Sequence, residues 1–126
     1  MANLHILLID DDALVLRSMK FLLERCGYAI RDFTDQERAL EALRLDSSGF
    51  DLVLIDYNMP GLTGIEVARA VRMIRKDLPV AITSGNIDDE LRSLADDAGV
   101  QELIPKPCSR DDLIAIVARL ANARCR

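Results

Sequence analysis

Short apolar runs alternate with amphipathic helical patterns along the whole chain, and this alternation restricts the possible folds more than any other feature. Each of five apolar runs has the length of a β-strand and is followed by a segment with helical spacing. Strands that alternate with helices pair in parallel, because each helix crosses back over the sheet before the next strand begins. The sequence therefore predicts an α/β domain, a doubly wound five-stranded parallel sheet with helices on both faces.

The predicted elements follow from the same periodicity and from turn residues at their ends. Strands are predicted over residues 4–9, 28–33, 51–56, 78–83 and 100–105. Helices are predicted over residues 13–26, from 34 or 35 to about 44, and over 65–75, 88–98 and 110–123. Asp12 and Ser109 have the side chains that cap a helix, and Gly27 is placed to end one. Leu14 and Leu16 are among the apolar positions of the first helix.

The length and charge of the chain exclude several classes of protein. At 126 residues the chain is expected to be one domain, residues 1–126, without an effector domain. A net charge of −5 argues against nucleic-acid binding, which requires a basic face. No apolar run is long enough to span a bilayer, so no membrane contact is expected. Cys26, Cys108 and Cys125 lack metal-ligand spacing and are interpreted as reduced thiols in the cytoplasm. His5 is interpreted as a strand-edge histidine that faces solvent or a neighbouring strand.

Charged and hydroxyl residues occupy the positions where the predicted strands end. Asp10 and Asp11 follow the first strand, Asp56 ends the third, Thr83 ends the fourth, and Lys106 follows the fifth. Because ligands bind at the carboxyl edge of a parallel sheet, these side chains are expected to converge in one crevice. Clustered carboxylates need a cation, and an all-oxygen ligand set suits Mg²⁺ or Mn²⁺. The lysine and the hydroxyl are placed to hold oxygens of a phosphoryl group, and a carboxylate can attack phosphorus.

Four motifs give the chain a family resemblance over essentially its full length. The segments "LLIDDD", "LVLIDYNMPGLTG", "AITSG" and "LIPKP" occur in the order and spacing of a response-regulator receiver domain. The chain resembles these phosphoacceptor domains of two-component signalling, and the resemblance implies a flavodoxin-like sheet with strand order 2-1-3-4-5. It further implies a domain that is phosphorylated by a histidine kinase or a histidine phosphotransfer protein and is not a turnover enzyme.

The resemblance also assigns roles to the residues of the predicted site. Asp56 would accept phosphate from a phosphohistidine of the partner protein. Asp11, Asp56 and the backbone carbonyl of Asn58 would bind the metal directly, and Asp10 would act mostly through a water molecule. Thr83 and Lys106 would bind the phosphoryl oxygens.

The last motif carries one match and one departure. The resemblance implies a cis bond between Lys106 and Pro107. Three residues before the lysine the family often has Tyr or Phe, a ring that moves with the threonine, whereas this chain has Leu103. The resemblance to receivers of hybrid sensor kinases, which often relax this position, is strongest in "TSGN" and "LIPKP". The oligomeric state and the output partner are left open by the sequence.

Two other interpretations compete with the phosphoacceptor. A phosphatase of the haloacid-dehalogenase class uses an aspartate at the end of its first strand in a D-x-D pattern, and Asp10 with Asp12 has that spacing. Ala13 and Leu14, however, do not supply the Thr or Val that usually follows. A degenerate receiver that only docks partners without being phosphorylated is the second alternative, and the complete set of site residues argues against it.

Overall fold

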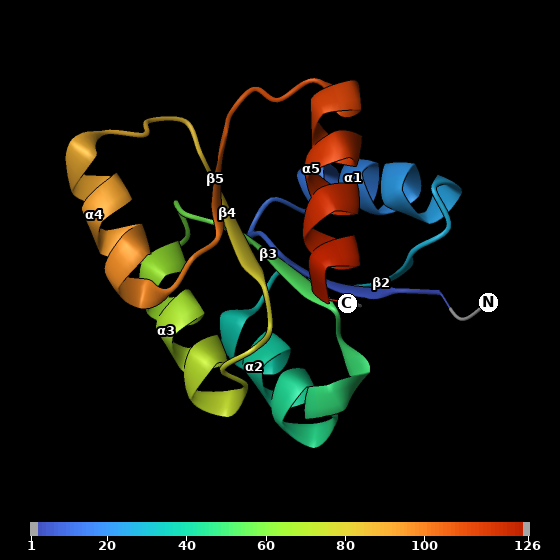
Figure 1. The fold of residues 1–126 in the computed structure, drawn as a ribbon, viewed down its shortest axis with the longest axis horizontal. Helices are drawn as coiled ribbons and strands as arrows, with labels where there is room; N and C mark the ends of the chain where they lie inside the picture. Colours follow the sequence, from blue (N-terminus) through green and yellow to red (C-terminus); the bar gives the residue numbers. More distant parts are fainter. Residues whose placement is uncertain (1–2, 125–126) are drawn as a thin grey trace.

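The computed structural model describes residues 3–124 and has the predicted alternation of strands and helices (Figure 1). The strands are β1 (His5–Ile9), β2 (Ala29–Phe33), β3 (Leu52–Asp56), β4 (Val80–Ser84) and β5 (Glu102–Pro105). The helices are α1 (Ala13–Arg25), α2 (Gln36–Leu45), α3 (Gly64–Ile74), α4 (Asp89–Ala98) and α5 (Arg110–Arg124), with a short 3₁₀ turn, η1, at Ser47–Gly49. Among the described helices, none is both long and apolar enough to cross a membrane.

The five strands form one parallel sheet in the order β2-β1-β3-β4-β5, which confirms the predicted fold. The order in which strands are added to the sheet reverses at β1, because β2 pairs with one edge of β1 and β3 pairs with the other. The register places Ile9 beside Ile55 and Asp56 beside Thr83. The ends of β1, β3 and β4 therefore lie next to one another at the carboxyl edge of the sheet.

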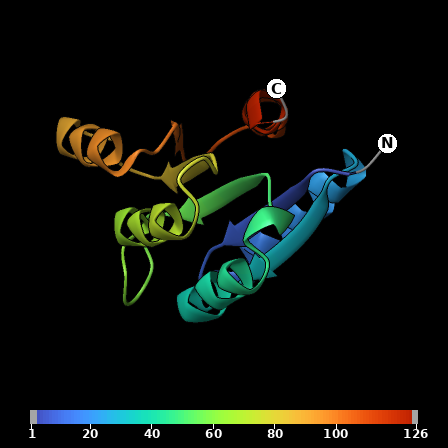
Figure 2. The same cartoon turned by 60° about the horizontal axis from the view of Figure 1, so that its bottom comes forward.

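Helices cover both faces of the sheet, and alternate strand residues pack into two separate cores. Helices α2, α3 and α4 pack on the face that contains Leu7, Val53 and Ile82. Helices α1 and α5 pack on the face that contains Leu8 and Leu54. Figure 2 shows the two groups of helices on opposite sides of the sheet. Burial on both faces explains why β1, β3 and β4 have continuous apolar sequences.

Several predicted boundaries differ from the structure by one or two residues. The first helix ends at Arg25, and Gly27 follows in the left-handed region with φ of +98°. The fourth strand begins at Val80 and continues to Ser84. Leu14 was expected among the apolar positions of the first helix, but its side chain is 72% exposed because it lies on the outer face of α1.

The helices begin at well-formed caps, some of which were not predicted. Asp12 accepts hydrogen bonds from the N–H groups of Leu14 and Val15, which confirms its capping role. Thr63 and Glu66 form a reciprocal capping box at the start of α3, and the T-x-x-E pattern predicts such a box. These caps fix the loops at the carboxyl edge of the sheet.

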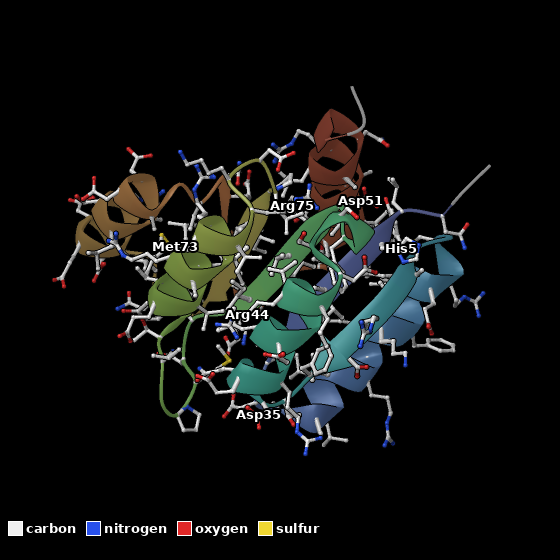
Figure 3. The ribbon with its side chains drawn as sticks, turned by 90° about the horizontal axis from the view of Figure 1, so that it is seen from below. His5, Asp35, Arg44, Asp51, Met73 and Arg75 are labelled. Atoms are coloured by element: carbon white, nitrogen blue, oxygen red, sulfur yellow. The ribbon has the colours of Figure 1, made fainter. Side chains whose placement is uncertain are left out.

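The opposite edge of the sheet, where the strands begin, is tied together by polar contacts. His5 is exposed at the start of β1, as expected, and its N–H donates to the carboxylate of Asp51 at 2.8 Å. Arg75 donates hydrogen bonds to the carbonyl oxygens of Ser47 and Phe50. Figure 3 shows His5, Asp51 and Arg75 toward this edge and Asp35 at the other end of the molecule.

Candidate functional site

The structure brings the predicted strand-end residues together at the carboxyl edge of the sheet. Asp10 follows β1, Asp56 ends β3, Thr83 lies one residue before the end of β4, and Lys106 follows β5. Asp10, Asp56 and Thr83 are 4%, 6% and 8% exposed, so two carboxylates are buried at one place. Buried carboxylates are costly unless they are paired or bind a cation, which indicates a binding site rather than a solvated edge.

Three carboxylates form the acidic part of the site. Oxygen atoms of Asp10, Asp11 and Asp56 all lie within 4.8 Å of one another, and Asp11 is the exposed member. The third aspartate of the consecutive run, Asp12, caps α1, while its N–H donates to Asp10 Oδ1 at 2.9 Å. The run thus divides into two residues of the acidic cluster and one residue that caps the helix.

Lys106 supplies the positive charge of the site. Its Nζ lies 2.7 Å from Asp56 Oδ1 and 3.7 Å from Asp10 Oδ2. Burial alone would lower the pKa of Lys106, but the hydrogen bond to Asp56 and the charges of both aspartates outweigh burial and raise it. The Lys106–Pro107 peptide bond is cis, as the resemblance implied, and the Lys106 N–H donates to the Ser84 carbonyl oxygen at 2.9 Å.

The environment of Asp10 disfavours its charged form. Burial is the main cause of the raised pKa of Asp10, and the negative charges of Asp56 and Asp11 also raise it. The hydrogen bond from the N–H of Asp12 and the charge of Lys106 act in the opposite direction without cancelling the effect. Burial and the crowding of like charges both make a nearby cation favourable for Asp10. The cluster has three carboxylates and its paired cation is Lys106, so the ionised site would attract a further cation.

Thr83 pairs with Asp56 across the sheet, and Asn58 follows Asp56 by two residues in the chain. The Thr83 carbonyl oxygen accepts a hydrogen bond from the N–H of Tyr57, which joins the end of β4 to the residue after Asp56. The Thr83 side chain lines an apolar groove that also includes Lys106. Asn58 is exposed and lines a polar pocket between the β3–α3 and β4–α4 loops. Thr83 thus lies beside Asp56 at the edge of the sheet, as the strand-end argument predicts. The metal-binding role that the resemblance implies for Asn58 stays a prediction.

Glycines allow the close turn that follows Asp56. A Cβ atom on Gly64 would lie 2.8 Å from the Tyr57 Cα, so the chain can close there only with glycine. Gly61 has φ of +88°, a conformation that other residues rarely adopt. Both glycines serve the turn after β3, as predicted.

Two polar contacts of the loops were not predicted. The Ser84 hydroxyl, 2% exposed, makes hydrogen bonds of 3.2 Å with both the N–H and the carbonyl oxygen of Asn86. The Gln36 side chain makes two hydrogen bonds with the backbone of Leu62. A serine hydroxyl that bonds the backbone two residues later forms a common type of turn, so the Ser84 contact could have been predicted. No sequence pattern connects residue 36 with residue 62.

The donor set of the acidic cluster fits a magnesium ion. All three groups are carboxylates, with no histidine or thiolate among them, and Mg²⁺ prefers hard oxygen ligands. Asp11 remains exposed, which leaves the cluster open to water and to a phosphoryl group. The two thiols that the structure describes, Cys26 and Cys108, are unpaired and stand outside this cluster, while Cys125 lies outside the described residues.

The fold and the site together define a flavodoxin-like α/β domain with an acidic site and a lysine at the carboxyl edge of its sheet. Residues 6–118 match the family model for the response regulator receiver domain. The chain belongs to this family, and it is a receiver domain of two-component signalling.

Comparison with individual proteins agrees with this assignment. The chain is 34% identical over 113 residues to the transcriptional regulatory protein FixJ of Bradyrhizobium diazoefficiens, covering 90% of this chain and 54% of FixJ. It superimposes on a receiver domain protein of Clostridium thermocellum with a TM-score of 0.90, 29% identity and 97% of both chains covered. The receiver domain of the sensor histidine kinase PA1611 of Pseudomonas aeruginosa, solved with a magnesium ion in its active-site cleft, shares the fold with a TM-score of 0.84. Its identity is 24%, with 96% of this chain and 99% of that chain covered.

The comparisons concern the receiver domain rather than the whole of each relative. This chain spans about half the length of FixJ and 20% of the putative response regulator ARR21 of Arabidopsis thaliana. Receiver domains bind Mg²⁺ through acidic residues, interact with histidine kinases or phosphotransfer proteins, and are in general not turnover enzymes.

Proposed function

We propose that this domain takes a phosphoryl group onto Asp56 from a phosphohistidine of a histidine kinase or a histidine phosphotransfer protein. The observation that carries the proposal is the placement of Asp56, 6% exposed, within the acidic cluster and 2.7 Å from Lys106 Nζ. A carboxylate held in this way is fixed in orientation beside a positive charge. Such a carboxylate can act as a nucleophile toward phosphorus.

The metal requirement follows from the same cluster. Asp11, Asp56 and the Asn58 carbonyl would hold Mg²⁺, with Mn²⁺ as a second possible ion, and Asp10 would act through a bound water. When bound, the ion neutralises negative charge between the carboxylates and the incoming phosphoryl group. The exposed Asp11 and the buried Asp10 and Asp56 are all within reach of one ion.

The residues of the chain then have separate tasks in the transfer. One Asp56 oxygen forms a bond to phosphorus while the bond between phosphorus and the partner's histidine nitrogen breaks. The electron pair of that bond stays on the imidazole. Lys106 shifts its ammonium group from Asp56 to a phosphoryl oxygen, and the Thr83 hydroxyl donates a hydrogen bond to another, because charge-assisted hydrogen bonds of this kind are strong.

The groove beside the site is a suitable surface for the phosphodonor protein. Its lining residues come from α1, the end of the sheet and the start of α5: Val15, Met19, Thr83, Ile104, Lys106, Pro107, Cys108 and Leu113. Since Thr83 and Lys106 belong to both the groove and the site, a protein that delivers phosphate to Asp56 would cover the groove. A partner that contains the phosphohistidine is therefore its proposed occupant.

The competing phosphatase interpretation has less support. Its D-x-D pattern requires Asp10 and Asp12 to act together, but Asp12 is engaged as the cap of α1 and is absent from the acidic cluster. We therefore propose a phosphoacceptor that is not a turnover enzyme and that functions in the cytoplasm with its kinase. The single-domain assignment of residues 1–126 stays a prediction.

A small phosphodonor tests the proposal without knowledge of the partner. The domain is incubated with phosphoramidate and Mg²⁺, and intact mass is followed with time. We expect the mass of one phosphoryl group to appear and to be removed by hydroxylamine, which cleaves acyl phosphates. Steady hydrolysis of p-nitrophenyl phosphate without a hydroxylamine-sensitive adduct would support the phosphatase and contradict the proposal.

A further inference from the structure

The loop that joins β3 to α3 lies directly beside the acidic cluster. It follows Asp56 and begins with Tyr57 and Asn58. The loop closes on itself where the Gly64 N–H donates to the Tyr57 carbonyl oxygen at 3.1 Å. Tyr57 is fixed by this contact and by the hydrogen bond from its N–H to the Thr83 carbonyl oxygen. The part of the loop whose position depends on a further tether is therefore its middle, residues 58–62.

Gln36, the first residue of α2, holds the middle of the loop at two points. Its Oε1 accepts a hydrogen bond from the Leu62 N–H at 3.0 Å, and its Nε2 donates to the Leu62 carbonyl oxygen. The Gln36 side-chain amide thus pairs with both backbone groups of Leu62, as a neighbouring strand would, although 26 residues separate Gln36 from Leu62 in sequence. We refer to this pair of hydrogen bonds as the Gln36 clasp.

The clasp is the main polar tether of residues 58–62, the middle of the loop. Within residues 3–124, the backbone groups of residues 58–62 make no other hydrogen bond to the rest of the protein. The side chains of Met59 and Leu62 pack against the core, so apolar contacts also stabilise the loop. The clasp fixes the position of Leu62 relative to the start of α2. Hydrogen bonds are directional, whereas apolar packing allows sliding.

The rest of α2 keeps Gln36 in place. Asp35 caps the helix by accepting hydrogen bonds from the N–H groups of Glu37 and Arg38, which fixes the backbone on both sides of Gln36. Figure 3 shows Asp35 at the end of α2 that lies away from Asp51 and Arg75. A Cβ on Gly61 would lie 3.0 Å from Gln36 Oε1, so the loop passes close to the amide.

We infer that Gln36 is a positioning residue for the metal site: the clasp fixes the loop that presents the Asn58 carbonyl to the ion. This inference rests on the proposed function, in which Asn58 is a metal ligand. Residues that orient metal ligands without touching the ion typically change metal affinity by about 10- to 100-fold. Because Gln36 acts on one of the ligands through the backbone, we expect an effect at the lower end, about tenfold.

The test is a magnesium titration of the folded domain followed by amide chemical shifts. Gln36→Met keeps the length of the side chain and removes both hydrogen bonds, and Gln36→Glu keeps the acceptor but places a carboxylate against the Leu62 carbonyl. Both variants should bind Mg²⁺ about tenfold more weakly than the parent chain, and exchange of the Leu62 amide hydrogen should be faster. The neighbouring substitution Glu37→Gln, on the exposed surface of the same helix, is the matched control and should change neither quantity.

The possible outcomes separate this inference from the function on which it rests. If the parent chain binds Mg²⁺ at Asp11 and Asp56 while Gln36→Met and Gln36→Glu bind it equally well, the clasp has no positioning role and the inference fails alone. A lower urea midpoint in chelator with unchanged Mg²⁺ affinity would likewise assign Gln36 a purely structural role and overturn the inference. If the parent chain shows no Mg²⁺-dependent shifts at these aspartates, the proposed metal site and the inference both fail.

Discussion

The Lys106 ammonium group donates a hydrogen bond of 2.7 Å to Asp56 Oδ1, which links the loop after β5 to the end of β3. The same Nζ lies 3.7 Å from Asp10 Oδ2, so one cation bridges two of the three carboxylates. Before phosphorylation the lysine balances part of the carboxylate charge. We propose that after phosphorylation it binds the phosphoryl group instead.

Asp56→Asn should abolish the hydroxylamine-sensitive phosphorylation of the domain. An amide is a far poorer nucleophile than a carboxylate, and Asp56 is the carboxylate at the end of β3 beside the lysine. The measurement is the intact mass after incubation with phosphoramidate and Mg²⁺. The expected signal is the unmodified mass, with circular dichroism as the control for folding. Stoichiometric labelling of this variant would show that another residue is the acceptor.

Phosphorylation should stop almost completely when a chelator removes divalent cations. Without a divalent cation, the incoming phosphoryl group is repelled by three carboxylates, and Lys106 offsets only part of their charge. The repulsion between two charges at close range is on the order of a few kcal/mol, which is enough to slow the transfer greatly. Asp11→Ala should weaken Mg²⁺ binding more than Asp10→Ala, because Asp11 is proposed to bind the ion directly. Calorimetric titration of the two variants measures this difference. Transfer at an undiminished rate in excess EDTA would contradict the proposed site.

Much of this site follows from the sequence through one geometric rule. The apolar runs predict parallel strands, and Asp10, Asp56 and Thr83 become neighbours because parallel strands end at the same edge. The strand order came from the family resemblance, since periodicity does not determine which strands are adjacent. The contact between Gln36 and Leu62 could not be predicted, because it depends on how α2 and a distant loop pack together.

The stability of metal-free protein should depend on Asp10 in a pH-dependent way. Burial raises the pKa of Asp10, so the folded state favours the protonated carboxyl. The stabilising contribution of Asp10 is therefore present at acidic pH and is lost as pH rises through its raised pKa. Asp10→Asn, which is neutral and keeps the acceptor for the Asp12 N–H, should match the parent chain at acidic pH and be more stable near neutrality.

Urea unfolding of both chains in EDTA across this pH range tests the sign. The other titrating groups are common to both chains, so the difference between the two free energies of unfolding reports Asp10 and the groups that interact with it. A parent chain that is more stable than Asp10→Asn at neutral pH would show that pairing with Lys106 outweighs the cost of burial. In that case our account of the charge balance would be wrong.

Phosphorylation should change the structure mainly near the site, because Leu103 provides no ring that could move with Thr83. Leu103 lies beside Ile82 in the sheet, is partly buried, and packs against the core that α4 covers. Amide shifts of the free and the beryllofluoride-bound domain in Mg²⁺ should differ most around Thr83 and Ser84 and little on the exposed face of α5. Leu103→Tyr is the matched comparison and should extend the changes. Large changes across α5 in the parent chain would contradict this prediction.

The most direct test of the central claim is the identity of the modified residue. The domain is phosphorylated with phosphoramidate and Mg²⁺, the acyl phosphate is reduced with borohydride, and the peptides are sequenced by mass spectrometry. Reduction converts a phosphorylated aspartate to homoserine, which marks the site permanently. The account predicts homoserine at position 56, while Asp10 and Asp11 stay unmodified. Homoserine at position 10 instead of position 56 would contradict it and would favour the phosphatase interpretation.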